Sequence, residues 1–215
     1  LLAIEVDPGL IELLRRRFGP GLELMEADAR FVDWRALARR LGGPLGVVGN
    51  LPFYAATVIL ERLLEQRDAV AFMVLSFQRE VASRIVSCPG ERSYGSLSVF
   101  CQLYTAVRWE MTIPRWAFCP VPRVDAAVLR FLPLARPRVP VEDEEGFQRV
   151  VRGVFRHRRK ALRNALRLAL GLSPERVERL LGRAGIHPLR RPETLSLEEF
   201  GRLVREMRPC LGQGR

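Results

Sequence analysis

The 215-residue sequence contains almost no lysine, and it has no long apolar run. Lys160 is its single lysine, so 34 of its 35 basic residues are arginines. No uninterrupted apolar stretch approaches the roughly 18–20 residues that a membrane-spanning helix requires. Residues 1–6 lead directly into Asp7 without the charged segment and the cleavage site of a signal peptide. We therefore expect a cytoplasmic protein without a membrane partner.

Cysteine and histidine are also scarce. The two histidines, His157 and His187, lie far apart and lack acidic or cysteine neighbours at the spacing of metal ligands. The four cysteines have no paired spacing, which excludes a disulfide framework and a zinc site and suits a reducing cytosol. They are Cys88, Cys101, Cys119 and Cys210. We expect no metal.

What the sequence does have is an excess of positive charge. Lys and Arg number 35 against 24 Asp and Glu, which gives a formal net charge of +11. Hydrophobic residues make up 48%, so the chain is not a disordered one. Arginine binds phosphate through two parallel hydrogen bonds and stacks on bases, which favours a nucleic-acid partner. A GC-rich or thermophilic coding bias would explain arginine over lysine, but it explains the excess of base over acid less easily.

Residues 1–134 alternate between short apolar runs and helical periodicity, which is typical of an α/β fold. We predict strands at residues 1–6, 22–27, 45–48 and 69–75, and helices at residues 8–18, 34–41 and 55–64. The run at 69–75 is continuously apolar, as in a strand that is buried on both faces of a parallel sheet. A helix at 96–104 and two strands at 106–113 and 124–132 follow, and the strands predict an antiparallel pair at the sheet edge.

The pattern changes after a proline-rich linker at residues 132–140. No strand pattern remains beyond it, and we predict helices near residues 143–156, 159–170, 174–184 and 196–206. Ser173 and Ser196 each stand where a serine caps a helix with acids in its first turn. We therefore expect an α/β body at residues 1–134 and a small all-α domain at residues 141–210.

Polar residues follow three of the predicted strands, at the edge of a parallel sheet where ligands bind. Glu5 ends the first strand, and an acid at such a position accepts hydrogen bonds from ribose hydroxyls; the alternative is a solvated acid near a helix start. Asp28 follows the second strand, where it suits an adenine amino group or, equally, a turn.

The third strand ends in Asn50-Leu51-Pro52-Phe53, and this is the most specific signal in the chain. The amino group of a base is a poor nucleophile because its lone pair is delocalised into the ring. The side-chain oxygen of Asn50 and the carbonyl of Leu51 can accept from that amine, while Pro52 stiffens the turn and Phe53 offers a face for an extruded base. The alternative is an ordinary strand-to-helix loop.

This turn resembles the Asn-Leu-Pro-Tyr/Phe motif of the rRNA adenine N6-dimethyltransferases, a branch of the class I S-adenosylmethionine-dependent methyltransferases. The resemblance runs from residue 1 to about residue 205, and the bacterial KsgA type fits it better than the Erm type. The other segments that carry it are Ile4-Glu5-Val6-Asp7, Glu26-Ala27-Asp28-Ala29, Phe77-Gln78-Arg79-Glu80-Val81-Ala82, Phe118-Cys119-Pro120-Val121-Pro122-Arg123-Val124-Asp125 and Phe155-Arg156-His157-Arg158-Arg159-Lys160-Ala161-Leu162-Arg163-Asn164.

The resemblance implies a Rossmann-like class I methyltransferase sheet with a helical RNA-binding domain. It also implies N6-dimethylation of two adjacent adenosines near the 3′ end of 16S rRNA in the pre-30S subunit, by a monomer. Phe118 is then expected to stack on the target base opposite Phe53. The expected S-adenosylmethionine-binding residues are Glu5, Val6, Asp28, Ala29 and Asn50, and the expected catalytic residues are Asn50, Leu51, Pro52, Phe53 and Phe118.

In that family a first strand and a Gly-rich loop precede the acid that matches Glu5, whereas four residues precede it in this sequence. The family loop cradles the methionine part of the cofactor, so we expect the 215-residue chain alone to hold the cofactor incompletely. This favours one alternative, a non-catalytic RNA-binding assembly or transcription factor on the same fold; the intact Asn50-Leu51-Pro52-Phe53 motif argues against it. A dinucleotide-dependent oxidoreductase is a weaker alternative, because the turn has no role there.

A basic stretch marks the start of the helical part. Residues 149–167 contain eight basic residues and no acid. Six of them follow steps of three and four and form one face if the segment is helical throughout: Arg149, Arg152, Arg156, Arg159, Arg163 and Arg167. A charge run is often only a solvated helix face, but without interleaved acids it repels itself, which favours an anionic partner. With Arg123, which the resemblance adds, the expected RNA-binding residues are Arg123, Arg149, Arg152, Arg156, Arg159, Lys160 and Arg163.

Overall fold

The computed structural model describes the backbone of residues 1–211 and side chains through Met207. The side chains of residues 208–210, the last ones of the predicted 141–210 domain and Cys210 among them, lie outside the described residues. The chain divides into two compact units, Leu1–Ser76 and Phe77–Arg215, which we describe one at a time. These units follow from packing, and the expected division into functional domains near residues 134–141 stays a prediction.

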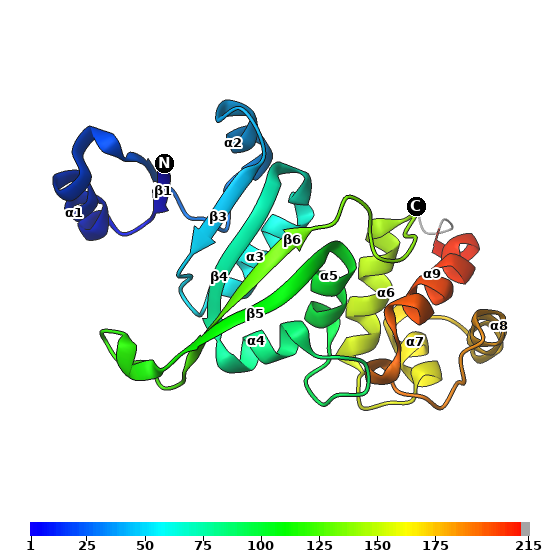
Figure 1. Ribbon diagram of the computed structural model, residues 1–215. Helices are drawn as coiled ribbons and strands as arrows, with labels where there is room; N and C mark the ends of the chain where they lie inside the picture. Colours follow the sequence, from blue (N-terminus) through cyan, green and yellow to red (C-terminus); the bar gives the residue numbers. More distant parts are fainter. Residues whose placement is uncertain (212–215) are drawn as a thin grey trace. The chain divides into compact units, whose positions relative to one another are not determined.

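The first unit opens with a strand, a helix and a second strand: β1 (Leu2–Glu5), α1 (Pro8–Phe18) and β2 (Glu23–Glu26) (Figure 1). The two strands are parallel and pair from Leu2 with Glu23 to Glu5 with Glu26. Helix α1 begins where it does because the Asp7 carboxylate accepts from the first free amides of the helix and Pro8 occupies the first turn.

The rest of the first unit contains α2 (Trp34–Arg40), β3 (Leu45–Gly49), α3 (Ala56–Glu65) and the greater part of β4 (Val70–Gln78). Strand β3 runs parallel to β4, with Val47 opposite Met73. The apolar face of α3 supplies Leu60 and Leu63, which are fully buried together with Met73 and Leu75 of β4. This cluster is the core of the unit.

The second unit begins within β4 and continues through α4 (Arg79–Val86) and α5 (Ser96–Tyr104) to β5 (Thr105–Ile113) and β6 (Ala126–Pro133). Strands β5 and β6 form the predicted antiparallel pair, with a bulge between Trp109 and Met111. The strand order of the four-stranded sheet is β3-β4-β6-β5, so the pair lies at its edge as predicted. Phe77 of β4 packs edge-on against Phe131 of β6 with ring centroids 6.1 Å apart.

Helices α6 (Glu144–Arg156), α7 (Leu162–Leu170), α8 (Pro174–Ala184) and α9 (Leu197–Leu211) pack together at the C-terminal end of the second unit (Figure 1). The two predicted serine caps are confirmed, since Ser173 accepts from the amide of Arg176 and Ser196 from the amide of Glu199. Four 3-10 turns complete the elements at Gly19–Gly21, Arg67–Ala69, Arg115–Ala117 and Pro192–Thr194.

The strands differ from the prediction in two respects. They form a two-stranded sheet of β1 and β2 and a separate four-stranded sheet, because no described strand pairs with the second edge of β1 or of β3. Val48 of β3 is 75% exposed. In β4, Phe72 is 38% exposed, so that strand is not covered throughout.

Candidate functional site

Three carboxyl ends of strands in the first unit carry the side chains that the sequence singled out. Glu5 is the last residue of β1, and Asp28 follows β2 by two residues. The parallel pairing brings these ends to one edge, where the amide of Ala27 donates to the carbonyl of Glu5 over 3.0 Å. Asn50 follows directly on the end of β3.

The carboxylate of Glu5 is held by the turn that follows it. Its Oε1 atom accepts from the backbone amides of Val6 at 2.7 Å and Asp7 at 2.9 Å. No hydrogen bond to Oε2 is recorded among the described residues. A carboxylate that is fixed through one oxygen and keeps acceptor capacity on the other suits a ligand with hydroxyl donors, such as a ribose.

The carboxylate of Asp28 is engaged by a neighbour that the sequence analysis did not single out. Nε of Arg30 donates to both oxygens at 3.0 and 2.9 Å, Nη2 donates to Oδ2 at 2.6 Å, and the Arg30 amide donates to Oδ1 at 2.9 Å. The side-chain hydrogen bonds from Arg30, followed by its amide, lower the pKa of Asp28 below its ordinary value. Asp28 is therefore an ionised acceptor at neutral pH.

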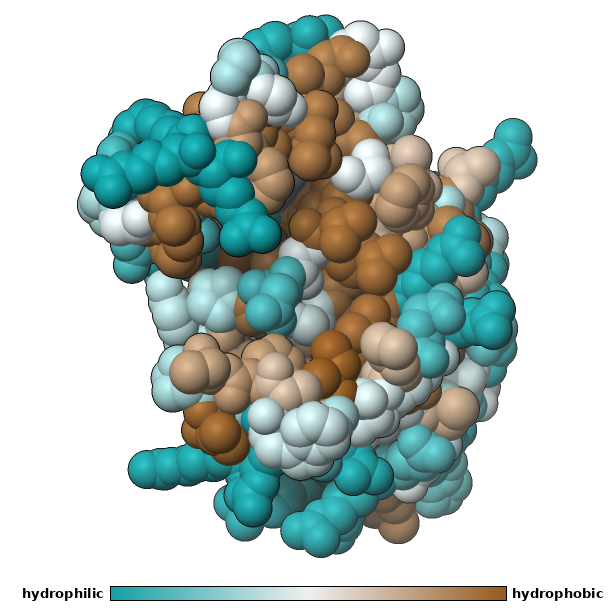
Figure 2. All heavy atoms as spheres, turned by 60° about the vertical axis from the view of Figure 1, so that its left-hand side comes forward, coloured by the Kyte–Doolittle hydropathy of each residue, from teal (hydrophilic) through white to brown (hydrophobic). Residues whose placement is uncertain are grey.

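Arg30 also reaches the turn after β3. Its guanidinium carbon lies 5.5 Å from the ring centroid of Phe31 and 5.8 Å from that of Tyr54, both within cation–π range. The two rings are 78% and 77% exposed. Figure 2 shows hydrophobic residues, in brown, beside hydrophilic ones, in teal, on one face of the protein. One guanidinium thus links the carboxylate after β2 to the turn after β3.

The side chain of Asn50 is oriented by the end of β4. The Ser76 hydroxyl donates to Oδ1 of Asn50 over 2.6 Å, and Ser76 is only 4% exposed. A carbonyl oxygen has two lone pairs, so Oδ1 can accept a second hydrogen bond while Ser76 fixes its direction.

The turn itself is compact. The carbonyl of Pro52 accepts from the amides of Ala55 at 2.9 Å and Ala56 at 3.0 Å, which leads the chain into α3. Gly49 permits the close return of the chain, since a Cβ there would lie 2.8 Å from the side chain of Leu51. Phe53 is half-buried in the turn.

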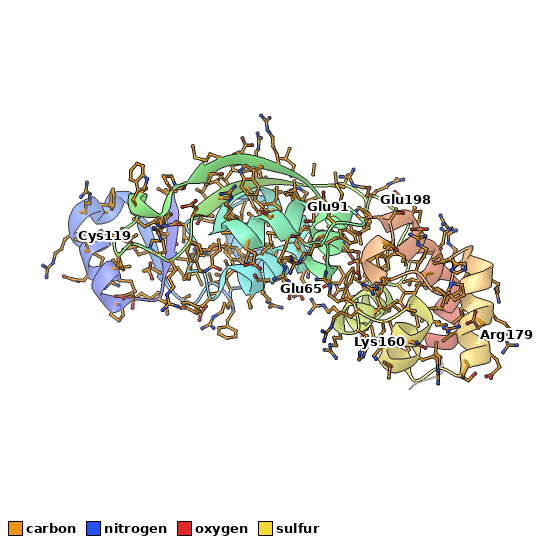
Figure 3. The ribbon with its side chains drawn as sticks, turned by 90° about the horizontal axis from the view of Figure 1, so that it is seen from below. Glu65, Glu91, Cys119, Lys160, Arg179 and Glu198 are labelled. Atoms are coloured by element: carbon orange, nitrogen blue, oxygen red, sulfur yellow. The ribbon has the colours of Figure 1, made fainter. Side chains whose placement is uncertain are left out.

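Phe118 and Arg123 belong to the second unit, on the proline-rich loop between β5 and β6, where Figure 3 labels Cys119. The Asp125 side chain accepts from the amide of Arg115 at 2.9 Å, and the Asp125 carbonyl accepts from the amide of Arg79 at 2.9 Å, so both ends of the loop are held. Phe118 is half-buried and Arg123 is exposed. The approach of Phe118 to Phe53 stays a prediction.

The predicted basic face does not lie on one continuous helix. Helix α6 ends at Arg156 and α7 begins at Leu162, because Ala161 takes an extended conformation with ψ 146°. Arg149, Arg152 and Arg156 therefore lie on α6, Arg163 lies on α7, and Arg159 and Lys160 lie in the connecting turn, where Figure 3 labels Lys160.

Some cations of this surface already have partners. Arg163 lies 3.8 Å from Glu178, Arg158 donates to the carbonyl of Arg92, and the guanidinium of Arg152 lies over the ring of Phe100. No ion pair is recorded for Arg149, Arg156 or Arg159 among the described residues, and all three are exposed. These are the cations best placed to meet an external anion.

Sequence reasoning missed Arg30 and Ser76. Ser76 acts on Asn50 from a neighbouring strand end, which no spacing within one segment reveals, whereas Arg30 contacts Asp28 two residues away and reaches Tyr54 in the turn after β3. The only signal was position, because Ser76 is the polar residue that follows the apolar run at 69–75.

Among the described residues, no group of three or more His, Cys, Asp or Glu side chains could hold a metal ion, and no helix is long and apolar enough to cross a membrane.

Comparisons with known proteins agree over nearly the whole chain. The family model described as "Ribosomal RNA adenine dimethylase" matches residues 1–208. The chain is 45% identical over 211 residues to "Ribosomal RNA small subunit methyltransferase A" of Geobacter metallireducens, covering 96% of this chain and 77% of that protein. The protein of the same name from Lactococcus lactis is 38% identical over 215 residues, covering 97% and 73%.

Solved structures show the same fold at low sequence identity. A dimethyladenosine transferase from Plasmodium falciparum matches with a TM-score of 0.79 at 20% identity, covering 97% of this chain and 82% of the other. The 23S rRNA methyltransferase ErmE matches with a TM-score of 0.67 at 22% identity, covering 95% and 80%. The mixed α/β methyltransferase fold with C-terminal helices that the sequence predicted is thereby confirmed.

Proposed function

Because the chain belongs to the ribosomal RNA adenine dimethylase family, we propose that it transfers methyl groups from S-adenosylmethionine to N6 of adenosines in the RNA of the small ribosomal subunit. Family membership makes it an rRNA adenine dimethyltransferase that uses S-adenosylmethionine. The finer target belongs to the proposal: two adjacent adenosines near the 3′ end of 16S rRNA, modified by a monomer.

Residues of the first unit fit the cofactor. S-adenosylmethionine, when bound, supplies a methyl group on a positively charged sulfur, which is strongly electrophilic. Glu5 would accept from the ribose hydroxyls, since its Oε1 is fixed by two amides of the following turn. Asp28, whose pKa the hydrogen bonds from Arg30 lower, would accept from the adenine amino group. Val6 and Ala29, the residues that follow these acids, would line the same pocket with their backbones.

The turn after β3 would handle the target amine. Oδ1 of Asn50 and the carbonyl of Leu51 would accept from its two N–H groups and draw the lone pair out of conjugation with the ring. The Ser76 hydroxyl holds Oδ1 in place. Pro52 would stiffen the turn, and Phe53 with Phe118 would stack on the extruded base. Placing the amine in line with the methyl group then needs no general base in the transfer step.

The exposed arginines would dock the RNA. Double-stranded RNA is recognised mostly through shape and phosphates, which suits a surface of cations without interleaved acids. The proposed RNA-binding residues are Arg123, Arg149, Arg152, Arg156, Arg159, Lys160 and Arg163. In this proposal residues 1–134 form the methyltransferase domain and residues 141–210 form the RNA-docking domain.

The turn at Asn50 carries the proposal, because a non-catalytic RNA-binding factor has no need of an amide oxygen held by a buried hydroxyl at a strand end. The test is methyl incorporation by the full-length protein into small subunits that lack the modification, followed by digestion to nucleosides. Wild type should give dimethyladenosine. Asn50→Ala should abolish most of the transfer and leave RNA and cofactor affinities near wild type, because the hydrogen bond strengthens as the amine loses conjugation.

A matched variant separates the acceptor from the shape of the side chain. Asn50→Asp keeps an acceptor oxygen of nearly the same geometry and should retain more transfer than Asn50→Ala. Equal incorporation by Asn50→Ala and wild type would remove Asn50 from the site. No incorporation by the full-length wild type on a competent subunit would favour the non-catalytic RNA-binding factor.

A further inference from the structure

We propose that Arg30 is a latch on the cofactor-binding carboxylate: its guanidinium and the adenine amino group of the cofactor compete for the oxygens of Asp28. This inference rests on the proposed function, in which Asp28 binds the adenine of S-adenosylmethionine. It adds a residue that controls the affinity of this carboxylate for the cofactor and its preference for a ligand with an amino group.

The contacts of Asp28 carry the first step. Its oxygens accept from three N–H groups of Arg30 at 2.6–3.0 Å: Nε–H is shared between both oxygens, Nη2–H goes to Oδ2 and the backbone amide to Oδ1. The side chains of Arg30 and Asp28 are only 36% and 24% exposed, so solvent screens the pair incompletely. A carboxylate offers about four lone-pair sites, and these three N–H groups occupy most of them. An adenine amino group that binds the oxygens held by the guanidinium must displace part of it.

The relative strength of the two donors gives the direction of the effect. A guanidinium makes a charge-assisted hydrogen bond to a carboxylate, which is stronger than the bond from a neutral amino group. Replacing the hydrogen bond from the guanidinium by one from the amino group makes the free energy of cofactor binding less favourable. The wild-type protein should bind the cofactor more weakly than a variant in which residue 30 has no donor.

The two aromatic rings beside Arg30 give the displaced guanidinium a place to remain. Its carbon lies 5.5 Å from the centroid of Phe31 and 5.8 Å from that of Tyr54, so it can leave Asp28 and stay over a ring. Tyr54 lies in the turn that begins at Asn50 and continues through Phe53. The guanidinium of Arg30 thus contacts the turn that would receive the target base. When it leaves Asp28, its contact with Tyr54 in that turn changes.

The test is calorimetry of S-adenosylhomocysteine, which has the adenosine of the cofactor without the sulfonium charge. Arg30→Met removes the donors and keeps an unbranched side chain, and it should bind about three- to tenfold more tightly than wild type, as expected for relief of one net hydrogen bond. The control is Arg40→Met, which removes the same charge from an exposed ion pair with Glu23 in the same unit and should leave affinity unchanged.

A ligand without the amino group identifies the contact. The purine analogue of S-adenosylhomocysteine has a hydrogen atom in place of that amine and no proton on N1, so it cannot donate to Asp28 and Arg30→Met should not improve its binding. In the wild type, the Nε–H proton of Arg30 should be protected from solvent exchange and lose protection when S-adenosylhomocysteine is added. This measurement needs no variant and holds even if Arg30→Met folds poorly.

Unchanged or weaker S-adenosylhomocysteine binding by folded Arg30→Met, with measurable binding by wild type, would overturn the latch and leave the proposed function intact. Retained protection of the Arg30 proton in the complex would do the same. Absence of any binding by full-length wild type would overturn the cofactor assignment itself, and the latch with it.

Discussion

The side chain of Asn50 is oriented by Ser76, a residue that is not proposed to contact the substrate. The hydroxyl of Ser76 is buried, and its one described hydrogen bond goes to Oδ1 of Asn50. A buried donor without an acceptor is costly, so this bond restrains both groups. Asn50 itself is exposed, and without Ser76 its amide would rotate among several orientations, of which few present Oδ1 to a base.

Ser76→Ala should therefore lower kcat while the affinities for S-adenosylmethionine and RNA stay near wild type. The expected loss corresponds to about 0.5–1.5 kcal/mol, the net worth of one neutral hydrogen bond. Ser76→Thr keeps the hydroxyl and should restore most of the rate. Single-turnover methylation of undermethylated subunits separates the chemical step from binding. A parallel loss in Ser76→Thr and Ser76→Ala would mean that packing, not the hydroxyl, matters at this position.

At the scale of elements, the sequence predicted the existence and type of the helices and strands better than their ends. The helix predicted from residue 159 begins at Leu162, because Ala161 is extended and Arg159 and Lys160 lie in a turn. Basic residues at helical spacing concealed this break, since the periodicity of charge continues through the turn. The role of Ser76 was not predictable either, because it depends on a contact between neighbouring strand ends, and the same holds for the contact of Arg30 with Tyr54.

Replacing Arg149, Arg156 and Arg159 with Gln should weaken RNA binding and flatten its dependence on salt. An arginine that binds a phosphate releases counterions from the RNA, and a glutamine in its place does not. The slope of log K against log salt should therefore fall by about 0.7–0.9 for each of these arginines that binds a phosphate in the wild type. Filter binding across a salt series gives this slope. The charge-matched control replaces Arg15, Arg16 and Arg40, which are paired with Glu26, Glu12 and Glu23 in the first unit.

An unchanged slope in the first triple variant, or an equal decrease in the control, would mean that the surface formed by α6 and the following turn is a solvated face. Cofactor affinity should remain at the wild-type value in both triple variants, since none of these arginines contacts Glu5 or Asp28 in the described structure.

The packing of α6 on α7 depends on Gly153. A Cβ at this position would lie 2.8 Å from the Cβ of Ala169, closer than side chains pack. Gly153→Ala should destabilise the protein by about 1–2 kcal/mol, because the cost of overpacking exceeds the gain in helix propensity. Gly182→Ala on α8 is the control, since a Cβ there meets nothing within 4 Å, and it should stabilise by about 0.5–1 kcal/mol.

Urea unfolding measures both changes. Adding Ala169→Gly to Gly153→Ala should recover part of the lost stability, and failure to recover any would place the strain elsewhere than the contact between the two helices.

Over the whole molecule, burial is uneven, and this follows from the divided sheet. Ile11 is the only buried residue in positions 1–31, and no residue of β1 or β2 is buried. By contrast, β4 and α5 contribute Met73, Leu75, Phe77, Val99 and Leu103 to the fully buried core. The alternation of strands and helices was readable from the sequence, whereas the exposure of β3 was not, since it depends on which strand edges find a partner.

Amide hydrogens of β1, α1 and β2 should therefore exchange faster than those of β4 and α5, because local opening there exposes little apolar surface. S-adenosylhomocysteine should slow exchange at the ends of β1 and β2, next to Glu5 and Asp28, and leave α7 and α8 unchanged. Mass-spectrometric hydrogen exchange on peptides measures both effects. Uniform protection through residues 1–78 would contradict the expected order of stability.

The single lysine gives the protein an unusual chemical handle. Lys160 is exposed and lies in the turn between α6 and α7, and it is the one lysine of the 215 residues that acylating reagents can modify. Within these residues, a fluorophore attached to a lysine therefore lies in the middle of the surface proposed to dock RNA. A protease that cuts only after lysine has one peptide bond to attack within them, and protection of that bond by rRNA would report docking without any engineered tag.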